Sequence, residues 1–473
     1  MYADIIVDIT HEKLDKIFQY RIPKEMEGRL QTGMEVLIPF GRANRETKGY
    51  VIGFSEKCNY DPEKIKEITQ IIQNHIAIEA KLVALAAWMK EHYGGTMIQA
   101  LKTVLPIKQQ EKQKEQRSIR LLLDRREAKE RLSYFLSKNQ TARARVVAAL
   151  LDRPILPYEY VTRQLKVTAA VLRAMEEQGI LQIEAEVVYR NPVTAKRTKQ
   201  QSFCYTEAQQ AAIHIFCEEY RRGKRGTYLV YGVTGSGKTE VYMEMIEHVI
   251  AEGKQAIVLI PEIALTYQTV MRFYQRFGDR VSIINSRLSK GERYDQMLRA
   301  KRGEINVMIG PRSALFTPFE RLGLIIIDEE HEGTYKSEQT PRYHARETAI
   351  ARAAMEGASV VLGSATPSME AFYKAVTGEF RLLRLPERAK QRAMAHVTVA
   401  DMRKELEKGN RSIFSDALRS LMEDRLKKKE QIMLFLNRRG YAGFISCRSC
   451  GHVVKCPHCD VSLSSHRNGK LVC

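Results

Sequence analysis

Five apolar runs alternate with helical segments in the middle of the chain, between about residues 199 and 390. Each run ends where polar residues begin, and the runs are "TYLVYG", "QAIVLIP", "INVMIG", "LGLIIID" and "SVVLGS". Strands that are apolar on both faces and alternate with helices form a parallel sheet that helices cover on both sides. The pattern therefore predicts an α/β domain, and the chemistry of such domains collects at the carboxyl ends of the strands.

The first 105 residues follow a different pattern, in which glycine and proline separate short extended segments. The segments "ADIIVDI", "FQYRIP", "MEVLIPFG" and "GYVIGF" predict a small β-barrel or sandwich. The stretch "IEAKLVALAAWMKEHYG" predicts a helix after them. The polar stretch "IKQQEKQKEQR" then predicts a linker or an exposed strand edge.

Residues 115–197 combine helical spacing with one alternating segment. "TARARVVAALLDR", "PYEYVTRQL" and "TAAVLRAMEEQGI" predict three short helices, and "LQIEAEVVYR" predicts a strand. This order is typical of a winged helix. Some winged helices bind DNA and others connect proteins, and the residues leave both roles open. The basic segment "NPVTAKRTKQQS" predicts a linker into the α/β domain.

Composition adds a polyanionic partner to this picture. In 473 residues, 76 Lys and Arg against 56 Asp and Glu give a net charge of +20. Nucleic acid is the commonest partner of such a chain, and a solvated surface with a lysine bias is the alternative. No stretch approaches the ~20 apolar residues of a membrane span, and the N-terminus lacks a secretory signal, so we expect no membrane partner. Five of the eight cysteines lie in residues 447–473, which favours metal ligation in a reducing cytoplasm.

The strand "TYLVYG" leads into the motif Gly232-x-x-x-x-Gly237-Lys238-Thr239, which opens a helical segment. In this context the glycines let backbone N–H groups surround a β-phosphate, and the helix N-terminus adds positive potential. We expect Lys238 to reach the β- and γ-phosphates and the Thr239 hydroxyl to bind Mg²⁺. The predicted phosphate loop consists of Gly232, Val233, Thr234, Gly235, Ser236, Gly237, Lys238 and Thr239.

The run "LGLIIID" ends at two carboxylates, Asp328 and Glu329. Asp328 is suited to holding the metal ion through water, and Glu329 to orienting and deprotonating the attacking water, which is the division that phosphoryl transfer needs. In isolation, this segment could equally be an acidic cap on a strand. Together with the phosphate loop it predicts ATP hydrolysis, with Lys238, Asp328 and Glu329 as the catalytic residues.

These motifs resemble those of superfamily 2 helicases. The segment "DEEH" at 328–331 resembles their DExH box, and "SAT" at 364–366 resembles the motif that couples hydrolysis to movement. The resemblance implies coupling roles for His331, Ser364 and Thr366. It also implies that Gln209, upstream of the phosphate loop in "YTEAQQAAI", recognises adenine.

Two further segments, "LIPEIALTYQ" and "IGPRSALFTP", resemble the strand-end loops with which these helicases touch the nucleic-acid backbone. Loops at the strand ends line one surface, and hydroxyls, backbone amides and the guanidinium of Arg312 suit phosphates. We therefore expect Arg312 to contact DNA.

More narrowly, the whole chain resembles the primosomal protein N′ (PriA) family. "GVTGSGKTEVY", "IIIDEEHEGTYKSEQTPRYHARE", "GSATPS" and "LFLNRRGYA" occur in that family's order, and a cysteine array follows them. The resemblance implies an α/β fold of RecA-like helicase lobes, preceded by a small β-rich domain and a winged helix, with a cysteine-rich zinc module in the second lobe. The implied domains are 1–105 (3′-DNA-end binding), 115–197 (winged helix), 199–390 (first lobe), 391–445 (start of the second lobe) and 446–473 (zinc module, truncated).

The resemblance implies an ATP-dependent 3′→5′ DNA helicase that recognises stalled or abandoned replication forks and starts replication again. The implied cofactors are ATP, Mg²⁺ and two Zn²⁺ per full-length chain. The implied partners are forked and single-stranded DNA, other primosome proteins, the replicative helicase or its loader, and single-stranded-DNA-binding protein, in the bacterial cytoplasm at the nucleoid. A fork-binding scaffold with an ATP switch, and another DExH nucleic-acid translocase, are the alternatives.

The family's N-terminal domain has a pocket for the 3′ end of a nascent strand. Phe18, Gly41 and Lys66 match the pattern of that pocket, and Phe18 could stack on a terminal base, although a phenylalanine is more often a core residue. The chain departs from the family at Gln19 and at Glu347, where the family has aspartate.

The cysteines form the pairs Cys447/Cys450 and Cys456/Cys459, followed by Cys473. In the family, eight cysteines hold two zinc ions, with the first and last pairs sharing one ion and the two middle pairs the other. The resemblance implies that Cys456, Cys459 and Cys473 belong to one site and the first pair to the other, with the remaining ligands and an ATP-completing arginine beyond this chain. The 473 residues alone would then hydrolyse ATP weakly. One four-cysteine site from the first two pairs is the alternative, although only five residues separate those pairs.

Overall fold

The computed structural model describes residues 1–58, 61, 64–72, 80–105, 115–187, 204–389, 395–435, 445, 447, 450, 452–465 and 470–473. The chain divides into two compact units, Met1–Arg392 and Ala393–Cys473. The predicted linker 191–202 and residues 107–114 of the segment predicted as a linker or strand edge lie outside the described residues, whereas its last three residues begin strand β6 (Glu115–Leu121).

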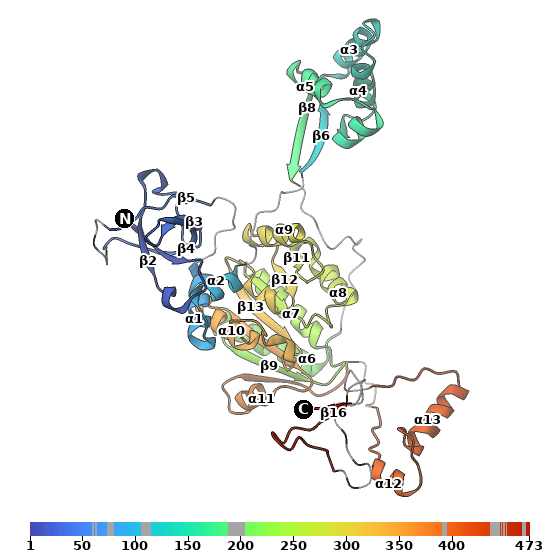
Figure 1. Ribbon diagram of the computed structural model, residues 1–473. Coiled ribbons are helices and arrows are strands. Elements are labelled where there is room, and N and C mark those ends of the chain that lie inside the picture. Colours follow the sequence, from blue (N-terminus) through green and yellow to red (C-terminus); the bar gives the residue numbers. More distant parts are fainter. Residues whose placement is uncertain are drawn as a thin grey trace. The chain divides into compact units, whose positions relative to one another are not determined.

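A seven-stranded sheet with the strand order β11-β12-β10-β13-β14-β9-β15 forms the largest layer of the first unit (Figure 1). All its recorded pairings are parallel, as the apolar runs predict. Two strands, β11 and β15, were not among the predicted runs. The strands are β9 (Thr227–Gly232), β10 (Gln255–Leu259), β11 (Val281–Ile283), β12 (Val307–Gly310), β13 (Leu322–Asp328), β14 (Ser359–Ser364) and β15 (Arg381–Leu385).

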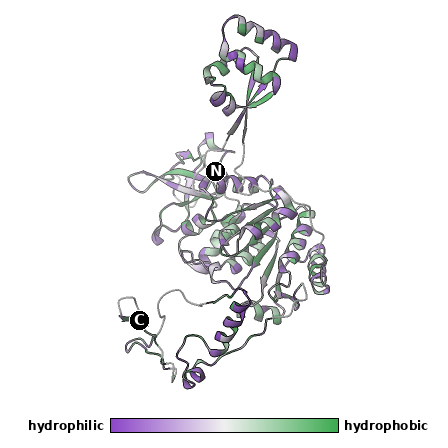
Figure 2. Ribbon diagram, turned by 90° about the vertical axis from the view of Figure 1, so that its right-hand side faces the viewer, coloured by the Kyte–Doolittle hydropathy of each residue, from purple (hydrophilic) through white to green (hydrophobic). Residues whose placement is uncertain are grey.

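Helices cover both faces of this sheet. Alternate residues of a strand point to opposite faces, and each face packs against a different set of helices. In β13, Leu324 and Ile326 join one cluster with α6, α7 and α8, whereas Ile325 and Ile327 join another with α9, α10 and α11. Hydrophobic residues concentrate in the interior of these layers, and hydrophilic residues are common on the outer helices (Figure 2). The helices are α6 (Glu207–Arg221), α7 (Lys238–Ala251), α8 (Tyr267–Phe277), α9 (Lys290–Lys301), α10 (Ala345–Glu356) and α11 (Met369–Val376).

The N-terminal residues form a five-stranded sheet with the order β2-β1-β4-β3-β5 and antiparallel pairings. It has its own apolar core, which includes Ile5, Val36 and Val51. Two helices follow, α1 (Ala80–Tyr93) and α2 (Met97–Val104), and a capping box of Thr96 and Gln99 begins the second. The strands are β1 (Tyr2–Val7), β2 (Phe18–Arg21), β3 (Glu35–Phe40), β4 (Arg45–Ser55) and β5 (Gln70–Ile71).

Residues 115–187 have a separate core and the helix and β-ribbon content of a winged helix. Three strands with the order β7-β6-β8, namely β6 (Glu115–Leu121), β7 (Ile155–Pro157) and β8 (Leu181–Val187), accompany α3 (Arg125–Ser137), α4 (Thr141–Asp152) and α5 (Ala169–Glu177). The sequence reading missed α3, which buries only Ala128 and Phe135 and begins at a capping box headed by Asp124. The predicted helix in "PYEYVTRQL" is a single π-helical turn, Tyr160–Gln164.

The second unit contains two helices among its described residues, α12 (Met402–Glu407) and α13 (Asp416–Lys427). A short antiparallel ladder, β16 (Ser464–Ser465) with β17 (Leu471–Val472), lies among the cysteines. In the described part of this unit, Ser415 is the only buried residue. Across the described chain, no helix combines the length and the apolar character that crossing a membrane demands.

Candidate nucleotide and nucleic-acid sites

The phosphate loop joins the carboxyl end of β9 to the amino end of α7, where Gly237 is the N-cap residue with φ 80°. A Cβ atom on Gly237 would lie 2.4 Å from Nε2 of Gln209, and one on Gly232 would lie 2.6 Å from Oγ of Ser236. Side chains at these positions would therefore collide with the side chains of Gln209 and Ser236. Glycine keeps the backbone amides and the helix N-terminus open to an anion.

Two buried polar groups in this loop suit a phosphate ligand. The Lys238 side chain is 8% exposed, and its Nζ donates to the carbonyl of Gly232 at 2.9 Å. Within the described residues, the buried Oγ of Ser236 has no hydrogen-bond partner. A buried hydroxyl without a partner is costly, so a bound anion that accepts from it would stabilise the site. The donor set therefore fits the phosphates of a nucleotide.

The predicted carboxylates lie opposite this loop. Asp328 ends β13, and its Oδ1 accepts from the hydroxyl of Tyr242 at 3.2 Å. Burial, followed by the charge of Glu329, raises the pKa of Asp328 to about 6, whereas the ammonium of Lys238 acts in the opposite direction. Glu329 has φ 48°, in the left-handed region that non-glycine residues rarely adopt. Such strain gathers at functional turns, where the surrounding structure enforces it.

One cavity of about 710 Å³ unites the loop and the carboxylates. Gln209, predicted to recognise adenine, also lines it and donates from Nε2 to the carbonyl of Ser236 at 2.8 Å. Of the predicted ATP-site residues, those lining the cavity are Gln209, Thr234, Gly235, Ser236, Gly237, Lys238, Thr239, Asp328 and Glu329.

The sequence analysis did not predict six residues of the cavity wall: Cys204, Tyr205, Glu240, Arg272, Arg388 and Ala389. Arg272 forms an ion pair with Glu240. Arg388 has a buried Nε without a hydrogen-bond partner among the described residues, and the neighbouring Ala389 N–H donates to the carbonyl of Gly235 at 3.0 Å. No motif marks these residues, because β15 and a turn bring Arg388 to the loop from about 150 residues away.

The three predicted coupling residues lie in contact. Nδ1 of His331 is 2.7 Å from Oγ of Ser364, and its Nε2 is 3.5 Å from Oγ1 of Thr366. His331 also lies 3.7 Å from the carboxylate of Glu329. One imidazole thus contacts both the hydroxyls of Ser364 and Thr366, at the carboxyl end of β14, and the carboxylate of Glu329 at the nucleotide cavity.

A buried network that the sequence reading did not anticipate lies beside this histidine. Glu330 is 1% exposed, and its carboxylate accepts from Arg346 at 3.1 Å and from the backbone N–H of Ser368 at 2.6 Å. Arg346 also donates to Oγ of Ser368 at 2.5 Å. A fully bonded buried ion pair fixes the DEEH segment against the end of the SAT segment and the start of α10.

A second cavity, of about 810 Å³, lies at the carboxyl ends of β10 and β12, where the predicted DNA loops are. Arg312 lines it, but its Nη1 donates to the carbonyls of Thr334 at 3.0 Å and Lys336 at 2.7 Å. Arg312 therefore holds the loop that follows the DEEH segment. Arg293 and Lys336 add positive charge to the wall, which also carries the carboxylates of Glu262 and Glu338.

A third cavity, of about 840 Å³, lies in the N-terminal sheet and brings together Phe18, Gly41 and Lys66. The ring of Phe18 meets that of Phe40 edge-on at 5.2 Å, and Nζ of Lys66 donates to the carbonyl of Gly41 at 2.6 Å. An aromatic face beside cations suits the stacked base and the phosphate of a nucleic-acid end. Gln19 is 7% exposed, and its Nε2 donates to Asp4 at 3.1 Å.

Three of the five C-terminal cysteines lie close together. The sulfur atoms of Cys456, Cys459 and Cys473 lie within 4.8 Å of one another. The backbone N–H of His458, then the neighbouring thiol of Cys459, lowers the pKa of Cys456. Among the described residues, Cys447 and Cys450 are exposed and do not join this group. Three converging thiols fit a zinc ion, which takes four ligands in structural sites.

Comparison with known proteins gives two family matches. A family model described as a 3′ DNA-binding domain, PriA_3primeBD, matches residues 4–106. A DEAD/DEAH box helicase model matches residues 206–374. The first matched range contains every residue that lines the third cavity. The second contains the residues that line the nucleotide cavity, except Cys204, Tyr205, Arg388 and Ala389.

Curated relatives match over nearly all of this chain. Replication restart protein PriA of Bacillus subtilis is 35% identical, and the match covers 99% of this chain and 66% of that protein. The protein of the same name from Chlamydia muridarum is 34% identical over 100% of this chain and 63% of its own length. In Haemophilus influenzae the values are 32%, 97% and 62%. The chain therefore spans slightly less than two thirds of the length of these relatives.

Two solved structures show distant likenesses to this chain. RecG bound to a three-way DNA junction is 20% identical, covers 44% of this chain and 29% of that chain, and has a TM-score of 0.32. The Hef helicase domain of Pyrococcus furiosus is 18% identical, covers 46% and 47%, and has a TM-score of 0.29. Likenesses at this level are too remote to inform the function.

Proposed function

Because this chain belongs to the family of PriA replication restart proteins, we propose that the full-length protein is an ATP-dependent 3′→5′ DNA helicase acting at stalled or abandoned replication forks. The observation that carries the proposal is the nucleotide cavity, in which a phosphate loop and two carboxylates face each other. His331 connects the carboxylates to the hydroxyls at the carboxyl end of β14. An enzyme that couples ATP hydrolysis to movement on DNA needs a connection between the ATP site and the residues that contact DNA.

In the proposed reaction, the loop amides, the Ser236 hydroxyl and the Lys238 ammonium hold the β- and γ-phosphates of ATP. Lys238 must exchange its present bond to the Gly232 carbonyl for the phosphate oxygens. Mg²⁺, when bound near Thr239 and Asp328, would neutralise phosphate charge. Glu329 orients the attacking water and accepts its proton, because its carboxylate lines the cavity beside Asp328.

Arg388 is the missed residue that we expect to contact the nucleotide. Its Nε faces no acceptor within the described chain, and the turn that carries it is tied to Gly235 through Ala389. A guanidinium next to the phosphate loop would form charge-assisted hydrogen bonds to phosphate oxygens.

The second cavity supplies the proposed path for the DNA backbone. Ser286, Ser313 and the cations Arg293 and Lys336 line it at the ends of parallel strands. These groups contact phosphates without reading sequence, as a translocating enzyme requires. In this proposal Arg312 shapes the path through its bonds to the loop after the DEEH segment.

The third cavity is the proposed receptor for a 3′ DNA end, with Phe18 stacking on the terminal base and Lys66 near its phosphate. For the cysteines, we propose two zinc ions per full-length protein, one of them held by Cys456, Cys459 and Cys473 with a further ligand. The partners and the bacterial cytoplasmic location that the family implies belong to the proposal as well.

Strand displacement by the full-length protein tests the proposed function. The wild-type protein should unwind a forked duplex with ATP, and Lys238→Ala should abolish unwinding because the phosphates lose their buried cation. Lys224→Ala is a matched control, since Lys224 pairs with Glu219 ahead of β9, away from the cavity. Fork binding without any ATP-dependent unwinding by the wild-type protein would instead favour the scaffold alternative.

A further inference from the structure

Glu240, the third residue of α7, brings a carboxylate to the wall of the nucleotide cavity. The residue is 7% exposed. One of its oxygens, Oε1, forms the ion pair with Arg272 of α8. The other, Oε2, is buried and has no hydrogen-bond partner among the described residues. A buried carboxylate oxygen without a donor costs free energy, so this atom indicates a ligand that donates to it.

The phosphates of a nucleotide cannot be that donor. Phosphate and carboxylate oxygens are both negatively charged acceptors and repel each other. The guanidinium of Arg272 already balances the charge of Glu240, which therefore suits a neutral donor better than a metal ion. On ATP, the neutral donors are the exocyclic amino group of adenine and the ribose hydroxyls. The unpartnered oxygen therefore belongs to the nucleoside end of the ligand.

The position of Glu240 on α7 favours the base. Its backbone N–H donates to the carbonyl of Gly237 at 3.0 Å, and residues three apart lie on one face of a helical turn. Gly237 is the residue on which a Cβ would lie 2.4 Å from Nε2 of Gln209. Glu240 therefore lies on the side of α7 that meets Gln209, the residue predicted to recognise adenine.

The other polar side chains of this part of the wall already have partners within the chain. The amide of Gln209 donates from Nε2 to the carbonyl of Ser236 at 2.8 Å and accepts at Oε1 from the backbone N–H of Thr206 at 2.9 Å. The hydroxyl of Tyr205 donates to Glu244 at 2.8 Å. Gln209 thus supports the phosphate loop, and the carboxylate of α7 supplies the unpartnered acceptor next to it.

We propose that Glu240 selects the base of the nucleotide by accepting a hydrogen bond from the exocyclic amino group of adenine, while Arg272 holds the carboxylate in place. The inference rests on the proposed function, because it concerns the nucleotide that this cavity would hydrolyse. A 6-oxopurine presents a carbonyl oxygen where adenine presents N–H groups, and a carboxylate has no hydrogen to donate to it. Glu240 is therefore a specificity-determining residue, since a 6-oxopurine would leave its buried oxygen unpaired.

The first test compares ATP with inosine triphosphate (ITP), in which a carbonyl replaces the amino group, as ligands of the full-length protein without DNA. The wild-type protein should bind ATP at least about tenfold more tightly, the scale of one hydrogen bond to a charged group. Glu240→Gln keeps the side-chain size and adds an amide N–H that donates to the carbonyl of ITP, so the ratio should fall below about threefold. The loss of one negative charge affects the shared triphosphate equally, and the ratio therefore isolates the contact with the base.

A second variant tests the same contact without a change of charge. Glu240→Asp withdraws the carboxylate by one methylene, so it should lower the affinity for ATP about fivefold or more and the affinity for ITP little. Glu247→Gln is the matched control, because Glu247 also lies on α7 and pairs with an arginine of α8, Arg276, but does not line the cavity. Its ratio should equal that of the wild type.

The ribose is tested with 2′,3′-dideoxy-ATP, which keeps the amino group and lacks both hydroxyls. The ratio of its affinity to that of ATP should be the same in the wild type and in Glu240→Gln. A change in this ratio, with an unchanged preference for ATP over ITP, would assign the oxygen to the ribose and overturn the inference.

The remaining outcomes separate this inference from the proposed function. Equal binding of ATP and ITP by the wild-type protein overturns the role of Glu240, and so does a wild-type ratio in both Glu240 variants. A protein that binds ATP with the expected preference and unwinds no forked DNA overturns the proposed function alone, because binding is measured without DNA or hydrolysis. A protein that binds neither nucleotide overturns both.

Discussion

The nucleotide cavity and the cysteine group are the two proposed ligand sites that differ most in how they are built. The nucleotide cavity lies at the edge of a seven-stranded sheet with a dense core on each face, and Lys238, Ser236 and Asp328 are largely buried there. The cysteine group belongs to a unit in which, among its described residues, only Ser415 is buried. The packed cores around the nucleotide cavity keep its shape without a ligand. The segment around the cysteine group should need a bound zinc ion to fold stably.

Removal of zinc should have the largest effect, because binding of a structural zinc ion contributes on the order of 10 kcal/mol to folding of its module. Chelation should release two zinc ions per full-length protein and disorder the segment around residues 452–473. Thermal unfolding of the helicase lobe should not change. Hydrogen exchange before and after chelation measures both effects, and a lobe that melts together with the cysteine segment would remove the contrast.

Substitution of the thiols sharpens the same prediction. With interleaved pairing, Cys447→Ser and Cys456→Ser should each release one of two zinc ions from the full-length protein. A single zinc ion in the 473-residue chain that both substitutions abolish equally would establish the four-cysteine alternative.

The core of the lobe gives the next largest effect. Ile326 is completely buried in β13 between two neighbouring strands, so Ile326→Ala should lower the free energy of unfolding by about 2–5 kcal/mol. Val399→Ala in the second unit, where the side chain is 92% exposed, should change it by less than about 0.5 kcal/mol. Denaturant titration of both variants measures the difference. Similar losses would contradict the contrast between a packed first unit and an exposed second unit.

Substitution of His331, which contacts Glu329, Ser364 and Thr366, should give a smaller, selective loss. His331→Ala removes the contacts to Ser364 and Thr366 without removing a phosphate ligand, so unwinding should fall by about tenfold or more while ATP hydrolysis without DNA changes little. His214→Ala on the exposed face of α6 is the control. Equal losses of unwinding and basal hydrolysis would indicate a direct role in the ATP reaction.

Arg388 should give the smallest of these effects. Arg388→Ala should weaken nucleotide binding about tenfold, the scale of one hydrogen bond to a charged group. Arg384→Ala, an exposed arginine on β15, should leave the affinity unchanged. Fluorescent-nucleotide titration distinguishes the variants, and unchanged affinity in Arg388→Ala would exclude contact with the phosphates.

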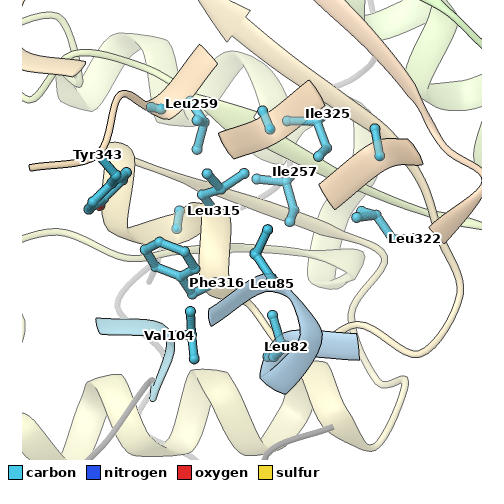
Figure 3. Close-up of a cluster of buried hydrophobic side chains, with 14 of the residues drawn as sticks. Leu82, Leu85, Val104, Ile257, Leu259, Leu315, Phe316, Leu322, Ile325 and Tyr343 are labelled. Atoms are coloured by element: carbon cyan, nitrogen blue, oxygen red, sulfur yellow. The ribbon is translucent and has the colours of Figure 1, made fainter. Parts of the chain in front are cut away.

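Functional residues could be predicted best where they lie close together in the sequence. The phosphate loop and the DEEH carboxylates could be found because each lies within one strand–loop–helix segment, and the parallel sheet that unites them follows from the apolar runs. Arg388 and the Glu330–Arg346–Ser368 network could not be found, because they depend on how distant strands end side by side. The packing of helix α1 on the helicase lobe through Leu85 could not be predicted either, because no motif marks it (Figure 3).

The measurement that tests the central account most directly is nucleotide binding and hydrolysis by Glu329→Gln in the full-length protein. The substitution keeps the side-chain volume and removes only the group that accepts the proton of the attacking water. The account predicts ATP affinity within about twofold of the wild type and DNA-stimulated hydrolysis lower by at least about 100-fold. Hydrolysis at the wild-type rate in Glu329→Gln would contradict it.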